Sequence, residues 1–372
     1  MTEQTELING NRIIFMDNLR TLIIFLVVLV HAGFVYNGVL SQVWIVNDSA
    51  YNTLSFIIFM IIDIFMMPTL FFISGYLVPL SLERNQGLKF IKSKFKRLYL
   101  PWVFAVLTLI PLYKLIFLYS RNLPQEKLLT YFHFNQGFVS QNWLWFLPVL
   151  FLFNVLYFLF AQVKPIKFSI AFPWAVFTAF WIGVAYTFIM GALKLEGWTL
   201  TPLLDFQNER LLIYLMIFLL GALGYQQKIF VAEPKNKKLY YLISCVVWLP
   251  VITYIFFSLN LLFNPGSYIT SRIGDEVLVY FCRNLSMLGL LYVLINTFRY
   301  YLNRRGRFLI QLNKNSYGVY IIHMIVMGWI AMAMLNTTIH STIKYLALTL
   351  LTFVISNLLT FIFRKVKESF HQ

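Results

Sequence analysis

Charged residues are scarce in this chain, and acidic ones are the scarcest. Only 12% of the 372 residues are charged, with 14 Asp or Glu against 30 Lys or Arg, whereas 60% are hydrophobic and the mean hydropathy is +0.73. A soluble domain averages about 25% charged residues, so this composition excludes an ordinary soluble enzyme and a disordered chain. The cations lie in short gaps between long apolar runs, so the pattern indicates a lipid bilayer and no nucleic-acid partner.

Cysteines and the common catalytic motifs are also missing or few. Cys245 and Cys282 both lie in apolar runs without neighbours at metal-ligand spacing, so we expect no metal site. The sequence has no Walker loop, no Gly-rich dinucleotide fingerprint and no Gly-x-Ser-x-Gly elbow. An enzyme built on this sequence therefore needs a histidine-centred acid–base site and a bound, activated donor.

Ten apolar runs reach the roughly 17–25 residues that a membrane helix requires. They cover residues 13–36, 53–80, 99–119, 143–161, 169–191, 211–226, 239–259, 277–298, 316–335 and 345–363. The gaps between them are too short for a separate soluble domain. We predict an all-α bundle of about ten transmembrane helices that forms one domain over residues 1–372.

The basic residues divide unequally between the two sets of alternate gaps. The set that includes 81–98 and the tail after 363 holds 20 Lys or Arg, and the opposite set holds 6. Because cytoplasmic loops carry the excess of basic residues, we expect both termini in the cytoplasm.

The first apolar run carries three ionisable residues, Asp17, Arg20 and His31. At 100° per residue all three fall on one side of a helix, with His31 about 16 Å from Arg20 along the axis. Such groups are costly in lipid and often functional. Histidine suits proton transfer because its ordinary pKa is near neutral. The alternative is an interfacial Asp17–Arg20 pair and a His31 that makes only an interhelical hydrogen bond.

The second run contains Asp63, Pro68 and Gly75, and a basic stretch follows it at residues 83–101. Pro68 and Gly75 predict a kink or interruption near the inner end of this helix, or simply a tolerated proline and a packing glycine. The basic stretch could bind phosphates, or it could lie as an amphipathic helix on anionic lipid.

Two later runs carry further candidates. Trp143 and Trp145 open the fourth run, where indoles are common at the membrane interface and could also stack on sugar rings. His323 lies about eight residues inside the ninth run and is the second intramembrane histidine.

In combination, four motifs resemble the acyltransferase-3 family of polytopic membrane acyltransferases. In order along the chain they are Arg20 to His31 with ten residues between, Leu-Phe-Phe-Ile-Ser-Gly-Tyr at 70–76 before the basic stretch, Trp-Leu-Trp-Phe-Leu at 143–147, and Ser-Tyr-Gly-Val-Tyr-Ile-Ile-His at 316–323. The length and the number of spans also fit this family.

The resemblance implies transfer of an acetyl or succinyl group from cytoplasmic acyl-CoA (acetyl-CoA or succinyl-CoA) to a hydroxyl of an extracytoplasmic glycan, at a bacterial cytoplasmic membrane. It implies that His31 is catalytic, assisted by Arg20 and Asp17. Lys94-Phe-Lys-Arg97 corresponds to the family's Arg-x-x-Arg element and would bind the donor, with Lys94 unable to form the paired phosphate contacts of an arginine. The residues expected to bind substrate are Ser74, Tyr76, Trp143, Trp145 and His323.

One motif departs from the O-antigen-type members, which typically have Gly-Val-Asp before the paired phenylalanines. This chain has Met66-Met67-Pro68-Thr69, which resembles the glucan-modifying (succinyltransferase-like) and intercellular-adhesin branches.

Two other classes of protein are consistent with the same features. An exporter of polysaccharide or small solutes could use His31 and Asp63 as a proton relay. It predicts internal repeats, which the sequence does not display, and gives no reason for a phosphate-binding stretch. A non-catalytic sensor or assembly protein leaves the polar face of the first helix unexplained.

Overall fold

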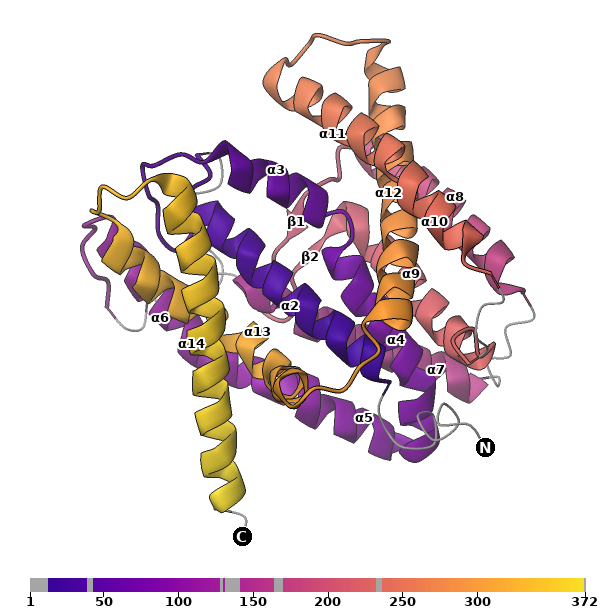
Figure 1. Ribbon diagram of the computed structural model, residues 1–372, viewed down its shortest axis with the longest axis horizontal. Helices are drawn as coiled ribbons and strands as arrows, with labels where there is room; N and C mark the ends of the chain where they lie inside the picture. Colours follow the sequence, from indigo (N-terminus) through magenta and orange to yellow (C-terminus); the bar gives the residue numbers. More distant parts are fainter. Residues whose placement is uncertain are drawn as a thin grey trace.

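The structure is a computed structural model of the chain. It describes residues 13–38, 43–127, 130, 141–163, 170–231 and 236–370. Within these ranges, ten helical segments are long and apolar enough to cross a membrane, at the ten places that the sequence predicts. The described part is almost entirely helical (Figure 1), so the predicted all-α bundle is confirmed.

The helices follow one another along the chain with short connections. Their bounds are α2 (Ile14–Val35), α3 (Thr53–Ile62), α4 (Met66–Arg84), α5 (Leu88–Lys94), α6 (Leu100–Ser120), α7 (Phe146–Val163), α8 (Phe172–Ala192), α9 (Asn208–Gln226), α10 (Lys238–Val246), α11 (Trp248–Phe263), α12 (Arg272–Tyr301), α13 (Arg307–Met334) and α14 (Ser341–Ser369). A π-helical turn (Phe95–Tyr99) joins α5 to α6, and a 3₁₀ turn (Asn142–Trp145) precedes α7. A short hairpin pairs β1 (Trp198–Thr199) with β2 (Phe206–Gln207), Trp198 opposite Gln207.

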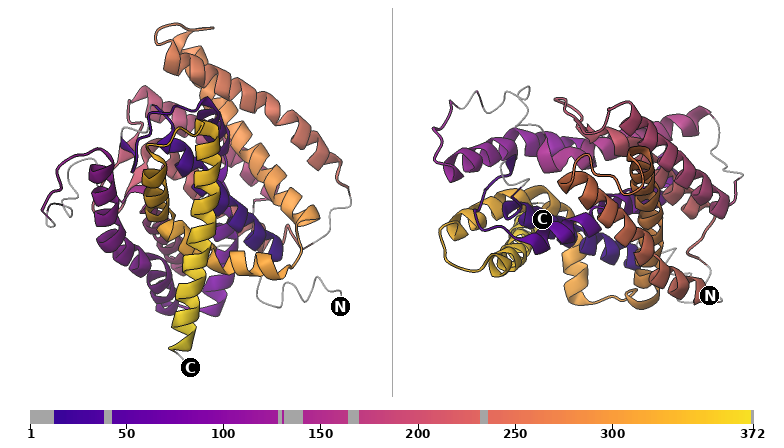
Figure 2. Two further views of the ribbon diagram at one scale, coloured as in Figure 1. Left: turned by 60° about the vertical axis from the view of Figure 1, so that its left-hand side comes forward. Right: turned by 90° about the horizontal axis from the view of Figure 1, so that it is seen from above.

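α2 lies in the interior of the bundle. It packs against α3, α4, α12, α13 and α14, whereas α11 lies at the periphery, side by side with α12 (Figure 1, Figure 2). The exposed side chains of α8 and α10–α11 are largely apolar, as expected of a surface that faces lipid. The helix that carries most of the predicted active-site residues is therefore enclosed by protein.

The interruption of the second span lies elsewhere than predicted. The helix is broken in its middle, at residues 63–65, shortly before Pro68, and not near its inner end or Gly75. Pro68 lies in the first turn of α4, where its missing N–H is not needed by the helix. At the break, Asp63 accepts two hydrogen bonds from Arg210 of α9, at 2.8 and 2.7 Å. This half-buried ion pair joins the break to α9.

Gly75 serves the close crossing of α4 and α9. A Cβ atom at Gly75 would lie 1.9 Å from the carbonyl oxygen of Phe218, and one at Gly221 would lie 2.3 Å from that of Phe72. Backbone meets backbone at this crossing, which only glycines allow. The glycine of the 70–76 motif is thus a packing residue.

We expect Gly75→Ala to destabilise the protein by about 1–3 kcal/mol or more, because neither backbone can move aside easily. Thermal unfolding in detergent measures the effect. Gly306→Ala is the matched control, since the nearest atom to its added Cβ is a leucine methyl at 4.0 Å. Equal melting temperatures for the two variants would contradict this packing role.

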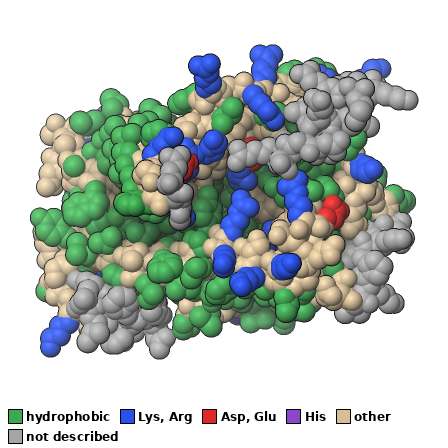
Figure 3. Space-filling model, turned by 90° about the horizontal axis from the view of Figure 1, so that it is seen from below, with side chains coloured by type: hydrophobic (Ala, Val, Ile, Leu, Met, Phe, Trp, Pro, Cys, Tyr) green, Lys and Arg blue, Asp and Glu red, His purple; other side chains and the backbone are tan. Residues whose placement is uncertain are grey.

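Cations gather at one end of the bundle, where α2 and α13 begin and where α4, α12 and α14 end. We call this the basic end. Figure 3 shows Lys and Arg side chains grouped on this face, with few acidic ones among them. The basic stretch forms the helix α5 and the π-helical turn, and Phe90 within it is fully buried against Phe158. Phe90 therefore packs one side of this segment against the protein, whereas Leu88 and Phe95 are exposed, so a helix that lies on anionic lipid stays an alternative for this segment.

Candidate active site

A pair of histidines connects two helices that are distant in the sequence. His31 of α2 and His323 of α13 approach within 2.8 Å, Nδ1 to Nε2, and their rings are nearly parallel at 4°. Nearer the basic end the same two helices are joined by Asn313 of α13, which accepts from Thr21 at 2.6 Å and donates to Asn18 at 2.8 Å. These polar contacts fix the register in which the histidines meet.

The surroundings of His323 decide where the protons lie in the neutral pair. His323 Nδ1 is 2.7 Å from the carbonyl oxygen of Tyr320 and 3.2 Å from that of Val319. A carbonyl only accepts, so Nδ1 of His323 carries the hydrogen and its Nε2 is the acceptor. His31 must then donate from Nδ1, which leaves its Nε2 with a free lone pair. The arrangement leaves Nε2 of His31 able to accept a proton, while a second residue holds the ring in place.

His31 is partly exposed, and aromatic rings flank it. Trp44 lies 5.2 Å away, ring centre to ring centre, and its indole N–H donates to the His31 carbonyl at 3.0 Å. Phe34 lies 5.9 Å away. Arg121 in turn donates to the carbonyl of Trp44 at 2.8 Å, which fixes the segment that carries the indole. Trp44 was not among the predicted site residues, because nothing in its sequence context distinguishes it from an interfacial tryptophan.

The two tryptophans of the 143–147 motif lie in different environments. Trp143 is buried behind the histidine pair and donates to the Ile321 carbonyl at 3.0 Å. Trp145 stacks on Tyr214 with 5.9 Å between ring centres, and it meets the edge of Trp198 in the hairpin at 5.4 Å. Trp198 is 46% exposed. Trp145 with Trp198 therefore forms an accessible aromatic cluster, whereas Trp143 packs in the interior.

A cavity of about 1630 Å³ opens at the basic end. Ordinary small-ligand pockets have about 300–1,000 Å³, so this one has room for a nucleotide-sized molecule with a long tail. Among the described residues, nine cations and three acids line the cavity, so it favours anions. The cations are Arg20, Arg84, Lys94, Arg97, Lys228, Lys237, Arg299, Lys314 and Arg364, and the acids are Asp17, Glu83 and Glu368.

Both residues predicted to bind the donor, and two of those predicted to bind substrate, line this cavity. Lys94 and Arg97 are three apart, so the helical turn presents both on one face, and Ser74 and Tyr76 line the wall formed by α4. The Tyr317 hydroxyl of α13 donates to the Arg97 carbonyl at 2.8 Å, which ties the π-helical turn to the helix of His323. Turns of this kind recur at functional sites.

Asp17 and Arg20 also line the cavity, where they form a 2.5 Å ion pair on the first turns of α2. The three residues predicted to share one face of the first helix, Asp17, Arg20 and His31, therefore lie in two separate places. The Asp17–Arg20 pair belongs to the basic cavity, and His31 lies beyond its inner end.

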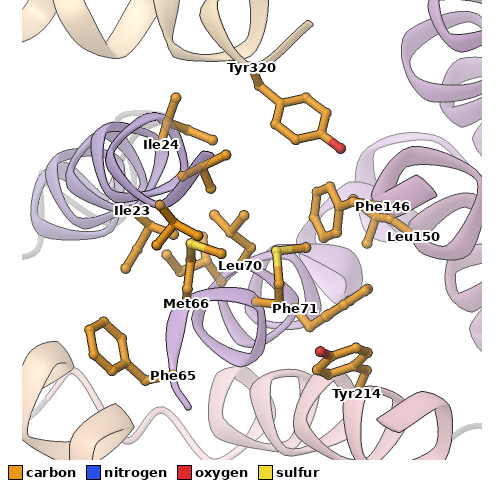
Figure 4. Packing of buried hydrophobic residues seen from close by; sticks show 14 of the residues in the cluster. Ile23, Ile24, Phe65, Met66, Leu70, Phe71, Phe146, Leu150, Tyr214 and Tyr320 are labelled. Carbon is orange, nitrogen blue, oxygen red and sulfur yellow. The ribbon is translucent and has the colours of Figure 1, made fainter. Parts of the chain in front are cut away.

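An apolar constriction separates the cavity from the histidines. The inner wall of the cavity includes Ile24, Leu70, Phe146 and Tyr320, which come from the four helices α2, α4, α7 and α13 (Figure 4). His31 lies seven residues beyond Ile24 on α2, or about 10 Å along the axis. A chain that reached from the cavity to His31 would pass through this constriction.

The fold and the site define a class, that of a multi-pass membrane protein with a histidine pair beyond a basic cavity. The acyltransferase domain of the acyltransferase-3 family matches residues 13–361. The chain therefore belongs to this family and is a membrane acyltransferase. Comparison with curated proteins and with solved structures finds no match.

Proposed function

We propose that this acyltransferase moves an acetyl or succinyl group from acyl-CoA, bound in the basic cavity, to a hydroxyl of a polysaccharide or other glycan on the opposite side. The basic end would face the cytoplasm of a bacterium, because cytoplasmic loops carry the excess of Lys and Arg. The observation that carries the proposal is the orientation of His31. Its Nε2 is a free base beyond a cavity suited to a phosphorylated donor.

The reach of the donor fits the length of α2. An extended pantetheine arm spans roughly 15–20 Å, and Arg20 and His31 are about 16 Å apart on the helix. With its phosphates among the cavity cations, including Lys94 and Arg97, the donor would place its arm in the apolar constriction and its thioester near His31. Arg20, oriented by Asp17, would contact the donor inside the cavity, before the arm enters the constriction. Ser74 and Tyr76 line the same cavity and would contact the donor.

The proposed chemistry uses one base. Nε2 of His31 takes the proton of the acceptor hydroxyl as its oxygen attacks the thioester carbonyl carbon. A C–O bond forms, the C–S bond breaks, and the leaving thiolate takes the proton from His31. His323 keeps the imidazole in the required tautomer and, as the acceptor of the Nδ1–H bond, stabilises the imidazolium. His323 is fully buried, so we assign it to positioning His31 and not to direct contact with substrate.

The acceptor would approach from the aromatic side of His31. Trp44 flanks the imidazole, and the cluster of Trp145 with Trp198 offers accessible rings on which a sugar could stack. Trp143 would contribute indirectly, by packing behind the histidine pair.

A proton-coupled exporter is less well supported. Its relay would need Asp63 to bind and release protons, yet Asp63 lies in a paired hydrogen bond with Arg210 that favours the ionised carboxylate. The ion pair instead joins two helices at the break in the second span.

The direct test is turnover by the purified protein in detergent, with acetyl-CoA and succinyl-CoA assayed in parallel by release of free CoA thiol. We expect turnover of at least one ester and saturable binding of that ester. If neither ester binds or reacts, the proposal is wrong and the exporter becomes the better explanation.

The positioning role of His323 can be tested separately. We expect His323→Ala to lower kcat by roughly 10²-fold with little change in the KM for the donor, because His31 loses the acceptor that fixes its tautomer. His323→Gln, whose side-chain oxygen can accept from His31 Nδ1, should restore part of the rate. Equal rates for both variants, or a change confined to KM, would contradict this role.

A further inference from the structure

The wall of the cavity formed by α13 and α14 carries cations outside the Lys94–Arg97 element. Arg364 lies near the end of α14, and its Nη2 donates to the side-chain oxygen of Gln311 at 2.9 Å. Gln311 donates onward to Asn315 at 3.2 Å, so the guanidinium is oriented by a short hydrogen-bonded row on α13. Arg364 and Lys314 both line the cavity.

Two nitrogen atoms of the Arg364 guanidinium are available to donate hydrogen bonds to a ligand. The Nε and Nη1 atoms are buried and make no hydrogen bond with any group in the described part of the chain. The nearest carboxylate oxygen, on Glu368, is 3.7 Å from Nε, and Glu368 is shared with Lys365 at 3.4 Å. Buried N–H groups without an acceptor are costly and need an explanation. A phosphate matches the planar fork of a guanidinium and would supply the missing acceptors.

Arg364 lies at a different depth in the cavity from Lys94 and Arg97, the residues proposed to bind the donor phosphates. Tyr317, bonded to the Arg97 segment, is six residues from His323, whereas Gln311 is twelve. The Arg364 site therefore lies about 9 Å farther from the histidines, towards the basic end. Two anion sites in line suit a donor with two separate anionic groups. In a CoA ester the diphosphate is nearer the thioester, and the ribose 3′-phosphate lies beyond it.

We propose that Arg364, aligned by Gln311 and assisted by Lys314, binds the ribose 3′-phosphate of the donor and makes the enzyme select CoA esters over 3′-dephospho-CoA esters. This inference depends on the proposed function, since it assumes a CoA-type donor. Lys94 and Arg97 then bind the diphosphate, and the arm extends from there towards His31.

The test compares binding of acetyl-CoA or succinyl-CoA, whichever the enzyme uses, with binding of its 3′-dephospho form. The proteins are the wild type, Arg364→Gln, Arg364→Lys and the control Lys365→Gln, which removes a neighbouring charge that does not line the cavity. Wild type should prefer the CoA ester roughly 10–100-fold, the range expected of a hydrogen-bonded charged contact. In Arg364→Gln the preference should fall to within about twofold, through weaker binding of the CoA ester alone.

Two further expectations make the test selective. Lys365→Gln should keep the full preference, and Arg364→Lys should restore part of it. Unchanged affinity for the dephospho ester in Arg364→Gln also shows that the variant is folded. The 3′-phosphate assignment is wrong if the wild-type protein does not prefer the CoA ester to its 3′-dephospho form. It is also wrong if Arg364→Gln weakens the binding of both esters equally. A wild type that binds neither ester instead overturns the proposed function itself.

Discussion

Replacing His31 with alanine should lower kcat for acyl transfer about 10²–10⁴-fold, the contribution expected of a general base. The variant keeps the basic cavity, because His31 is not among its lining residues, so affinity for the donor should change little. The rate of free CoA release by purified wild type and variant measures the effect. His340→Asn is the matched control: His340 caps the start of α14, and asparagine can also cap.

The contrast between kcat and donor affinity is what identifies the role. A His31→Ala protein that is correctly folded and fully active would show that His31 is structural. Loss of donor binding in this variant with unchanged kcat would place His31 in donor recognition and leave the base unidentified.

Lys344→Met should destabilise the protein by about 3–5 kcal/mol, because it leaves Asp48 buried without its partner. The two side chains are 2% and 3% exposed and meet at 2.9 Å. Asp48 belongs to the segment that carries Trp44, and its backbone N–H donates to the Val35 carbonyl at the end of α2 at 3.2 Å. The ion pair therefore anchors the residues that flank His31 to α14.

Thermal unfolding in detergent measures this destabilisation. Arg272→Gln, which breaks an exposed pair with Glu276, should change the melting temperature little and is the control. The double variant Asp48→Asn/Lys344→Met should recover much of the loss, since it removes both buried charges. A Lys344→Met protein as stable as wild type would contradict the anchoring role.

Local patterns in the sequence were sufficient for the framework. Each transmembrane helix is specified by its own hydropathy, and the sequence places Asp17, Arg20 and His31 on one helix because α2 is continuous. The basic stretch was predicted as a cluster of cations, and Lys94 and Arg97 do line a cavity. These inferences needed no knowledge of tertiary contacts.

Features that depend on tertiary packing could not be predicted in this way. The pairing of His31 with His323 joins residues 292 apart, and only their geometry indicates that His323 positions His31. The break at residues 63–65 lies in the turn before Pro68, where a proline removes a helical hydrogen bond, but the ion pair of Asp63 with Arg210 on another helix is not apparent from the sequence. Trp44 and Arg364 gain significance from their neighbours, His31 and Gln311, which the sequence does not bring together.

In the proposed reaction, the donor enters at the basic end and reacts at His31. This route is tested most directly in membrane vesicles of opposite orientation, since acyl-CoA does not cross a bilayer. External acyl-CoA should release free CoA thiol in inverted vesicles, where the basic end faces outward, with the rate in His31→Ala vesicles subtracted as background. Right-side-out vesicles should show no such release. Equal His31-dependent release in both orientations, or release only in right-side-out vesicles, would contradict the account.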